Sequence, residues 1–392
     1  MMAARPTAVV AGAVAQRPGV AGHAWVFVNW LVGLRDAGYD VVFVDRLEPE
    51  MLDDVDQPIE TSRQMAWLRL VMSEAGLNHD QVAVLNQRDH TCSGLSRDDL
   101  LQRCRDASVM LNTMGFIDDP EVLGSFERRV FLDIDPGFGQ FWRALGQADV
   151  FAGHDVIASV GLNLVGPGCT VPLAGLDVVT TLPPVALSHW PDAGPTPTRR
   201  TRTRATSVCT WRGPFAAVEH DGNRYGLRVH ELRRFAGLPG ALPSVDLELA
   251  LAIDPADAGD TANLTASGWH VVDPTPISAD LHSYGEYIRG SSMELMIAKE
   301  MYVRSQGGWF SDRSACYLAS GRPVVAQDTG FTHHLPTGEG LLAIHDVDEA
   351  VAAIKEVDGN WARHAKAARE LAVDLFDASG VVTSLLERVG VA

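Results

Sequence analysis

Near its carboxyl end the chain reads Gly308-Trp309-Phe310-Ser311-Asp312-Arg313-Ser314, then Tyr317-Leu318-Ala319-Ser320-Gly321-Arg322-Pro323-Val324-Val325, then Gln327-Asp328-Thr329-Gly330. This order predicts a loop, a short helix, a glycine stop, a buried strand and a second glycine loop. The helix should begin at Ser311 or Asp312, where free backbone N–H groups and the helix dipole favour an anion. The stretch therefore predicts a binding site suited to a diphosphate.

The order of these pieces resembles the donor-binding half of GT-B glycosyltransferases. In that family a small-residue helix closing on Gly-x-Pro-Val-Val, with a following Thr-Gly loop, holds a nucleotide-diphosphate sugar. The resemblance implies an α/β fold of two Rossmann-like domains that face each other across a cleft. Many members of its retaining group carry one glutamate just before the helix and another within it. Here those places hold Gly308 and Cys316, and Asp312 is the nearest substitute for the ribose-binding carboxylate.

Length and charge bound the possible functions. The chain has 392 residues, 46% of them hydrophobic, which is enough for two or three domains that each bury a core. Its 32 basic and 50 acidic side chains give a net charge of -18, which repels nucleic-acid phosphates. The basic run between Arg199 and Arg204 follows several prolines and fits a solvated linker. Nucleic acid is therefore not an expected partner.

Cysteine usage and hydropathy point to the cytoplasm. The five cysteines lie far apart without a Cys-x-x-Cys pair, so reduced thiols are expected rather than a zinc site or a disulfide framework. No apolar run reaches the roughly 20 residues that span a bilayer, and the segment before Gly22 lacks the layout of a signal peptide. We expect a cytoplasmic protein without a transmembrane segment. The oligomeric state stays open, a homodimer included.

The first half of the chain reads as a doubly wound sheet. A small-residue strand over 7–14 runs into a glycine loop, a helix follows over 23–37, and a second buried strand covers 41–45. Further strands are expected over 81–85, 107–111 and 129–132. We predict a Rossmann-like acceptor domain over residues 1–190, followed by a Pro/Arg-rich linker over 191–205.

The second half repeats the alternation of strands and helices. Strands are expected over 206–210, 247–253, 270–272 and 294–297, with helices between them, up to the region around Ser311. This predicts a second Rossmann-like domain over 206–359, which by the resemblance binds the nucleotide sugar. Helices should fill 360–392, and the tail from Gly380 resembles the segment that crosses back to the first domain in GT-B enzymes.

Three side chains of the first half are candidates for catalysis. His23 follows Gly22 where the first glycine loop meets the first helix, and this Gly-His pair resembles the inverting GT-B pattern, in which a neutral histidine removes the proton of an acceptor hydroxyl. Under the retaining pattern His23 would only line the acceptor pocket. Asp133 and Asp135 alternate at the end of a strand and should share one side. Acceptor contacts are the preferred role, with a turn or a metal site as alternatives; a GT-B enzyme generally needs no metal.

The second half supplies the donor-binding candidates. Arg212 follows the first strand of that half and could clamp a phosphate or lie on the surface. Lys299 precedes the helix of the opening stretch and could pair with phosphate or with a neighbouring carboxylate. The helix start and the loop after the next strand are assigned to diphosphate and sugar through Ser311, Asp312, Arg313, Ser314, Asp328, Thr329 and Gly330.

The expected activity is transfer of a sugar from a nucleotide-diphosphate donor to a hydroxyl of a small-molecule or sugar acceptor. The nucleotide sugar is a co-substrate, and no cofactor or metal is expected. Alternatives are an NAD-type oxidoreductase, a nucleotide-sugar epimerase, or a binder without catalysis. The oxidoreductase would need Gly-x-Gly-x-x-Gly after the first strand, whereas the chain has Gly12, Gly19 and Gly22; only Asp45 supports it. Donor identity, acceptor identity and stereochemical outcome stay open.

Overall fold

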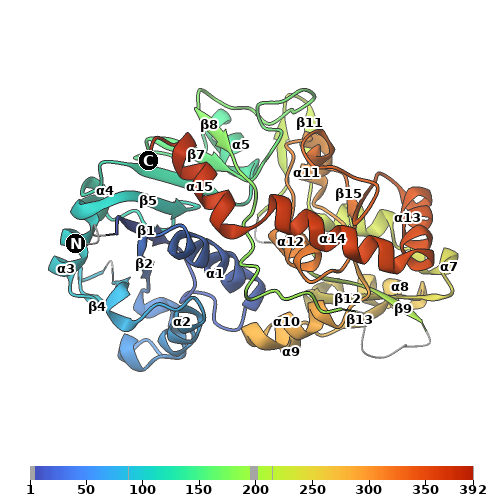
Figure 1. Ribbon diagram of the computed structural model, residues 1–392, viewed down its shortest axis with the longest axis horizontal. Coiled ribbons are helices and arrows are strands. Elements are labelled where there is room, and N and C mark those ends of the chain that lie inside the picture. The colour runs from blue at the N-terminus through green and yellow to red at the C-terminus, as the bar shows by residue number, and fades with distance from the viewer. Residues whose placement is uncertain (1–4, 87, 195–201, 214, 392) are drawn as a thin grey trace.

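The computed structural model describes residues 5–86, 88–194, 202–213 and 215–391. It contains two α/β domains that lie side by side (Figure 1). Residues 195–201 of the linker predicted over 191–205 lie outside the described residues. The first strand of the second domain starts at Thr203, slightly earlier than expected.

The first domain is built on an eight-stranded sheet of order β4-β3-β2-β1-β5-β6-β7-β8, in which only the β3–β4 pair is antiparallel. Its strands are β1 (Thr7–Ala11), β2 (Asp40–Arg46), β3 (Val82–Leu85), β4 (Cys92–Gly94), β5 (Ala107–Thr113), β6 (Arg129–Asp133), β7 (Val156–Ser159) and β8 (Val178–Thr180). Its helices are α1 (Ala21–Asp36), α2 (Arg63–Glu74), α3 (Arg97–Asp106), α4 (Pro120–Gly124) and α5 (Phe138–Ala144).

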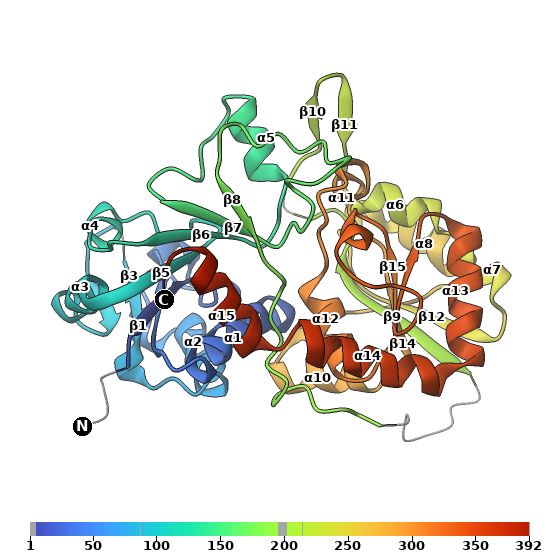
Figure 2. The ribbon, with the colours of Figure 1, turned by 45° about the horizontal axis from the view of Figure 1, so that its top comes forward.

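The second domain is built on a six-stranded parallel sheet of order β13-β12-β9-β14-β15-β16. Its strands are β9 (Thr203–Thr210), β12 (Val245–Ala252), β13 (His270–Val272), β14 (Met293–Met296), β15 (Val324–Gln327) and β16 (Leu341–Ile344), with a hairpin of β10 (Val218–His220) and β11 (Asn223–Tyr225) that projects from the domain in Figure 2. Its helices are α6 (Arg228–Arg234), α7 (Leu238–Ala241), α8 (Ala258–Ala266), α9 (Thr275–Ser278), α10 (Leu281–Arg289), α11 (Glu300–Ser305), α12 (Asp312–Ala319) and α13 (Val347–Gly359).

Both sheets reverse their strand order beside their first strand, which is the doubly wound pattern predicted from the sequence. The reversal lies between β1 and β5 in one sheet and between β9 and β14 in the other. In open sheets of this kind ligands bind beyond the carboxyl ends of the strands at the reversal. The fold therefore predicts a ligand site in the space that both of these sheet edges face.

Two long helices close the chain and join the domains. α14 (Trp361–Leu375) packs on α12, and α15 (Ala378–Arg388) returns to the first domain and packs along α1 (Figure 1). α1 and α15 approach each other closely because Gly33 of α1 has no side chain: a Cβ there would lie 2.7 Å from the Ala378 carbonyl oxygen. Within the described residues no helix combines the length and the apolar character needed to cross a membrane.

Candidate active site

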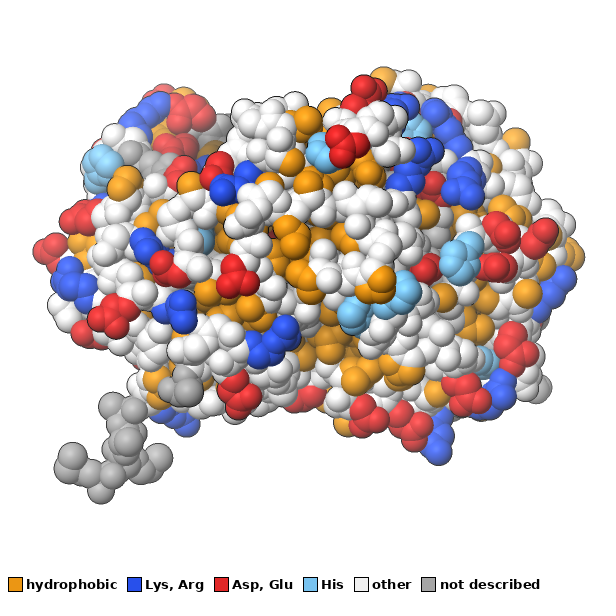
Figure 3. All heavy atoms as spheres, turned by 90° about the horizontal axis from the view of Figure 1, so that it is seen from above, with side chains coloured by type: hydrophobic (Ala, Val, Ile, Leu, Met, Phe, Trp, Pro, Cys, Tyr) orange, Lys and Arg blue, Asp and Glu red, His pale blue; other side chains and the backbone are white. Residues whose placement is uncertain are grey.

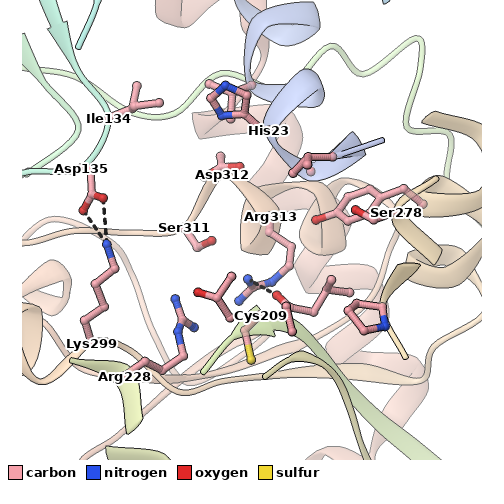
Figure 4. A pocket seen from close by; sticks show the side chains of 18 of the residues that line it. His23, Ile134, Asp135, Cys209, Arg228, Ser278, Lys299, Ser311, Asp312 and Arg313 are labelled. Carbon is pink, nitrogen blue, oxygen red and sulfur yellow. Dashed lines mark hydrogen bonds and ion pairs between the residues drawn. The ribbon is translucent and has the colours of Figure 1, made fainter. Parts of the chain in front are cut away.

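A cavity of about 490 Å³ lies where the two domains meet, within the range of small-molecule sites. Both domains supply its walls, each through segments that follow the carboxyl ends of strands (Figure 4). From above, hydrophobic side chains gather in the middle of the molecular face, and most charged side chains lie farther out (Figure 3). The first domain contributes Gly19, Val20, Gly22, His23, Val26, Ile134 and Asp135; the second contributes Val208, Cys209, Thr210, Arg228, Ala252, Pro274, Thr275, Ser278, Tyr284, Lys299, Tyr302, Trp309, Ser311, Asp312 and Arg313.

The start of α12 forms the cationic side of the cavity. Ser311 is the N-cap residue, and its side chain makes no capping hydrogen bond. Arg313, in the first turn, donates through Nε to Glu294 (2.5 Å) and through Nη1 to the Val208 carbonyl oxygen (2.7 Å). Its buried Nη2 has no partner among the described residues. Although burial opposes the charge, the Glu294 carboxylate holds the pKa of Arg313 above its ordinary value, so the cation is permanent.

A second arginine, Arg228, was missed by the sequence analysis. It occupies the first position of α6, is 7% exposed, and donates through Nη1 to the Ile297 carbonyl oxygen (2.8 Å). Its Nε is buried and lacks a partner in the described part of the chain. Burial and the neighbouring Arg313 both lower the pKa of Arg228. A cation at the positive end of a helix, next to another cation, is electrostatically unfavourable, so this arrangement favours an anion between them.

Lys299 and Asp135 connect the two domains across the cavity. The Lys299 ammonium lies 2.9 and 2.8 Å from the two Asp135 carboxylate oxygens and 3.1 Å from the Tyr302 hydroxyl. It also lies 5.0 Å from the centres of the Phe138 and Tyr302 rings, within range of a cation–π attraction. Burial lowers the pKa of Lys299, and the Asp135 charge opposes that effect. The ion pair is visible at the left of Figure 4.

His23 lies in the first turn of α1, beside Asp312 in Figure 4. Its Nε2 is 3.1 Å from the Ala13 carbonyl oxygen, an arrangement that requires the Nε2–H tautomer and leaves the lone pair on Nδ1. Burial, followed by the charge of Arg17, lowers the pKa of His23 to about 4. The imidazole is therefore neutral at pH 7.

Asp312 is the carboxylate of the cavity that belongs to α12. Burial raises its pKa to about 6, and the adjacent Arg313 partly offsets that effect. A carboxyl with this pKa exchanges its proton close to neutral pH, so it can either accept or donate a hydrogen bond to a bound hydroxyl. Sequence reasoning placed it here as the nearest substitute for a missing glutamate.

The structure brings together six of the twelve residues singled out from the sequence: His23, Asp135, Lys299, Ser311, Asp312 and Arg313. Asp133 instead lies inside the sheet, where it accepts hydrogen bonds from Gln140 (2.7 Å) and Ser159 (2.9 Å). Arg212 lies outside the cavity lining and pairs with Asp257 through two hydrogen bonds, of 2.7 and 2.6 Å. Neither residue is positioned to contact a ligand in the cavity.

The other predicted site residues that do not line the cavity are Ser314, Asp328, Thr329 and Gly330. The Ser314 hydroxyl is buried without a described partner. Thr329 supports the cavity wall from behind, donating from Oγ1 to the Trp309 carbonyl oxygen (2.5 Å), and Asp328 accepts the Gly330 amide (3.0 Å). These residues shape the loop rather than line the cavity.

Asp45, the residue that favoured a dinucleotide, is fully buried. Its carboxylate accepts hydrogen bonds from the Ala15 amide (2.6 Å), the Gln16 side chain (3.1 Å) and the Arg46 amide (2.7 Å). Because Asp45 is fully buried and both of its oxygens already accept hydrogen bonds within the protein, it is not exposed to a ribose. Within the described residues there is also no group of three or more His, Cys, Asp and Glu side chains that could hold a metal ion.

Similar architectures occur among solved structures. HepE from Anabaena, in complex with UDP-glucose, matches 98% of this chain and 100% of its own at a TM-score of 0.59 and 10% identity. An α-glucosyltransferase in complex with UDP and a 13-mer DNA matches 98% of this chain and 100% of its own, with a TM-score of 0.58 and 11% sequence identity. Sucrose-phosphate synthase from Thermosynechococcus elongatus matches 98% of both chains at 0.52 and 13% identity.

Comparison with protein-family models gave no match, and neither did comparison with curated proteins. The structural matches extend over essentially the whole chain and so include both domains. They confirm the predicted fold class: the protein has the two-domain GT-B fold of glycosyltransferases.

Proposed function

We propose that the protein is a glycosyltransferase that moves a sugar from a nucleotide-diphosphate donor to a hydroxyl of a small-molecule or sugar acceptor. One observation carries the proposal: two buried arginines line the interdomain cavity at helix N-termini, and each keeps a guanidinium nitrogen without a described partner. A buried donor without an acceptor is costly, and a diphosphate would satisfy both. UDP sugars are the first donors to test because similar folds bind UDP or UDP-glucose.

In this proposal the second domain stabilises the leaving nucleoside diphosphate. Negative charge grows on the diphosphate as the bond to the sugar breaks. The N–H groups at the start of α12, together with Arg313 and Arg228, would stabilise that charge in a partly dehydrated cavity. Because fixed cations supply this stabilisation, we propose a metal-independent reaction, for which activity in EDTA is the test.

The first domain would hold the acceptor next to the donor sugar. Its part of the cavity wall is apolar except for His23 and Asp135. We propose that the Nδ1 lone pair of His23 accepts the proton of the acceptor hydroxyl, and that Asp135 contacts sugar or acceptor hydroxyls when its pairing with Lys299 loosens. Asp312 would accept a donor hydroxyl from the opposite wall.

A ligand panel tests the proposed function. Purified protein is heated with UDP, dTDP, GDP or ADP and with their sugars, with and without EDTA, and with NADH in a parallel fluorescence titration. Binding to the folded state alone raises the melting temperature. Stabilisation by one nucleoside diphosphate, with transfer of its sugar in EDTA, supports the proposal. Binding without turnover would indicate a non-catalytic binder, and enhanced NADH fluorescence would indicate an oxidoreductase or epimerase.

His23→Gln should lower kcat by about 10²–10⁴-fold, because general-base catalysis contributes on that order. The glutamine Nε2 can still donate to the Ala13 carbonyl oxygen, so the substitution removes the base and keeps the loop contact. The neutral imidazole is the active form and its pKa is about 4, whereas Asp312 titrates near 6 in both proteins. The ratio of wild-type kcat to His23→Gln kcat should therefore be level above pH 5 and fall as the pH drops through about 4. The measurement is kcat against pH for both proteins with a saturating donor.

The matched control is His154→Gln, because His154 also bonds to backbone carbonyl oxygens in the first domain but does not line the cavity. It should keep kcat and its pH profile. A His23→Gln enzyme with less than a tenfold loss of kcat would show that His23 only lines the acceptor site.

A further inference from the structure

The loop that leads into α12 is hydrogen-bonded to the first domain. The Leu162 amide donates to the Gly308 carbonyl oxygen (3.2 Å), and the Asn163 amide donates to the Gly307 carbonyl oxygen (3.0 Å). Gly161 and Trp309 form an antiparallel bridge at the end of this pairing. We call residues 161–163 and 306–309 together the interdomain strap.

Asn163 is the side chain at the centre of the interdomain strap. It is fully buried. Its Nδ2 donates to the carbonyl oxygens of Gln306 (2.9 Å) in the second domain and of Pro167 (3.0 Å) in its own loop. Its Oδ1 lies 3.1 Å from Nε2 of His334, which must be the donor because an amide oxygen carries no hydrogen. One side chain thus links three segments of the two domains.

Two glycines allow the interdomain strap to form. A Cβ on Gly308, whose φ is +80°, would lie 2.3 Å from the Asn163 backbone nitrogen. A Cβ on Gly330, whose φ is +94°, would lie 2.5 Å from the Gln306 carbonyl oxygen. Both distances are impossible for real atoms, so neither position accepts a side chain without moving backbone. This explains why Gly308 stands where the GT-B resemblance leads one to expect a glutamate.

The strap holds parts of the cavity wall in place. Trp309 stacks on Tyr302, with ring centres 4.4 Å apart and planes at 22°, and both rings line the cavity. Thr329 fixes Trp309 from the other side through its carbonyl oxygen. Ser311 follows two residues later at the start of α12. The bonds of Asn163 therefore act on the segment that would face the donor sugar.

We propose that Asn163 is a positioning residue, which fixes the donor-side loop 306–309 against the acceptor domain so that donor sugar and acceptor hydroxyl are held in reacting geometry. This inference rests on the proposed function. Small errors in the position of reacting groups cost rate steeply. The diphosphate contacts are anchored separately, because Arg313 is held by Glu294 and Val208 and Arg228 by Ile297. Loss of the strap should therefore reduce turnover and leave nucleotide affinity intact.

Asn163→Ala tests the inference, with Asn112→Ala as its matched control. Asn112 is equally buried in the first domain, and its side chain likewise holds a loop, through the Ile117 carbonyl oxygen (2.8 Å) and amide (3.2 Å). It does not line the cavity. Asn163→Ser is a second, polar variant that removes the two Nδ2 hydrogen bonds without burying a charge, and it carries the test if the alanine variant does not fold.

Both Asn163 variants should lower kcat about 10²-fold, with the Kd of the nucleoside diphosphate changed less than about threefold. Asn112→Ala should lower the melting temperature similarly but keep kcat. Hydrogen exchange at the Leu162 amide and at the amide of residue 163 should be at least about tenfold faster in Asn163→Ser than in Asn112→Ala.

If the wild-type protein transfers a sugar and the Asn163 variants keep its kcat, this inference is overturned and the proposed function still stands. A fall in kcat that Asn112→Ala shares to the same extent also overturns it, because the loss would then follow general stability. Failure of the wild-type protein itself to bind a nucleotide or to transfer a sugar overturns the proposed function, and the catalytic part of this inference with it.

Discussion

Arg313→Ala should lower the free energy of unfolding by about 3–5 kcal/mol, and it should also reduce the stabilisation given by a nucleoside diphosphate. The first effect arises because the Glu294 carboxylate is fully buried and would lose its counter-ion. The second arises because the cavity loses a cation that has a free donor. Urea unfolding measures the first effect, and calorimetric titration with the diphosphate measures the second.

A double substitution separates the two effects. Arg313→Met with Glu294→Gln removes the stranded charge, so most of the lost stability should return, as it does when buried ion pairs are replaced by neutral residues. Affinity for the diphosphate should still be about 10–100-fold lower, the equivalent of a hydrogen bond to a charged group. The matched control is Arg204→Met with Glu248→Gln, a similarly buried Arg–Glu pair of the second domain that does not line the cavity. Unchanged affinity in the Arg313 double variant would exclude Arg313 from the diphosphate site.

Gly308→Ala should lower the free energy of unfolding nearly as much as Arg313→Ala does, although it adds only a methyl group. The residue has a φ of +80°, which costs about 1–2 kcal/mol for an L-residue. The Cβ would also press on the Asn163 backbone nitrogen, and backbone inside a hydrogen-bonded pairing has little freedom to yield. We expect a loss of at least about 3 kcal/mol in unfolding free energy, or a displaced loop with kcat lowered about 10²-fold. Denaturant unfolding and steady-state kinetics measure these effects.

Gly175→Ala controls for the backbone strain. Its φ is +79°, nearly the same as that of Gly308, but no atom lies within 4 Å of a Cβ built there. It should therefore show the strain alone and keep kcat. Equal effects of the two substitutions would mean that the approach of Asn163 to Gly308 contributes nothing.

The fold could be predicted because its signals are local. The small-residue helix, the Gly321 stop and the following apolar strand all depend on residues adjacent in sequence, and the structure has α12 and β15 there. The same holds for His23, since a helix after a glycine loop is readable from the loop itself. Local pattern and observed structure agree wherever the deciding contacts lie within one element.

The site was predicted less completely because its contacts join distant segments. Asp133 and Asp135 alternate, but the strand ends at Asp133, so the first lies within the sheet and only the second reaches the cavity. Arg212 is neutralised by Asp257, 45 residues away. Arg228 gave one usable signal, a cation in the first turn of a helix, which is unfavourable unless an anion binds there. Asn163 gave none, because its role depends on Gln306 and His334.

The return of α15 to the first domain also has a consequence for biosynthesis. The whole second domain is an insertion between α1 and the helix that covers it, so the outer face of α1 around Gly33 stays bare while the second domain is being made. The buried apolar face of α15 consists of Val381, Val382, Leu385 and Leu386, which are synthesised only after the whole second domain. Although domains generally fold in the order of synthesis, the first domain here can complete its fold only after the second domain and α15 have been synthesised. A nascent chain should therefore need protection of the apolar face of α1 until α15 has been synthesised.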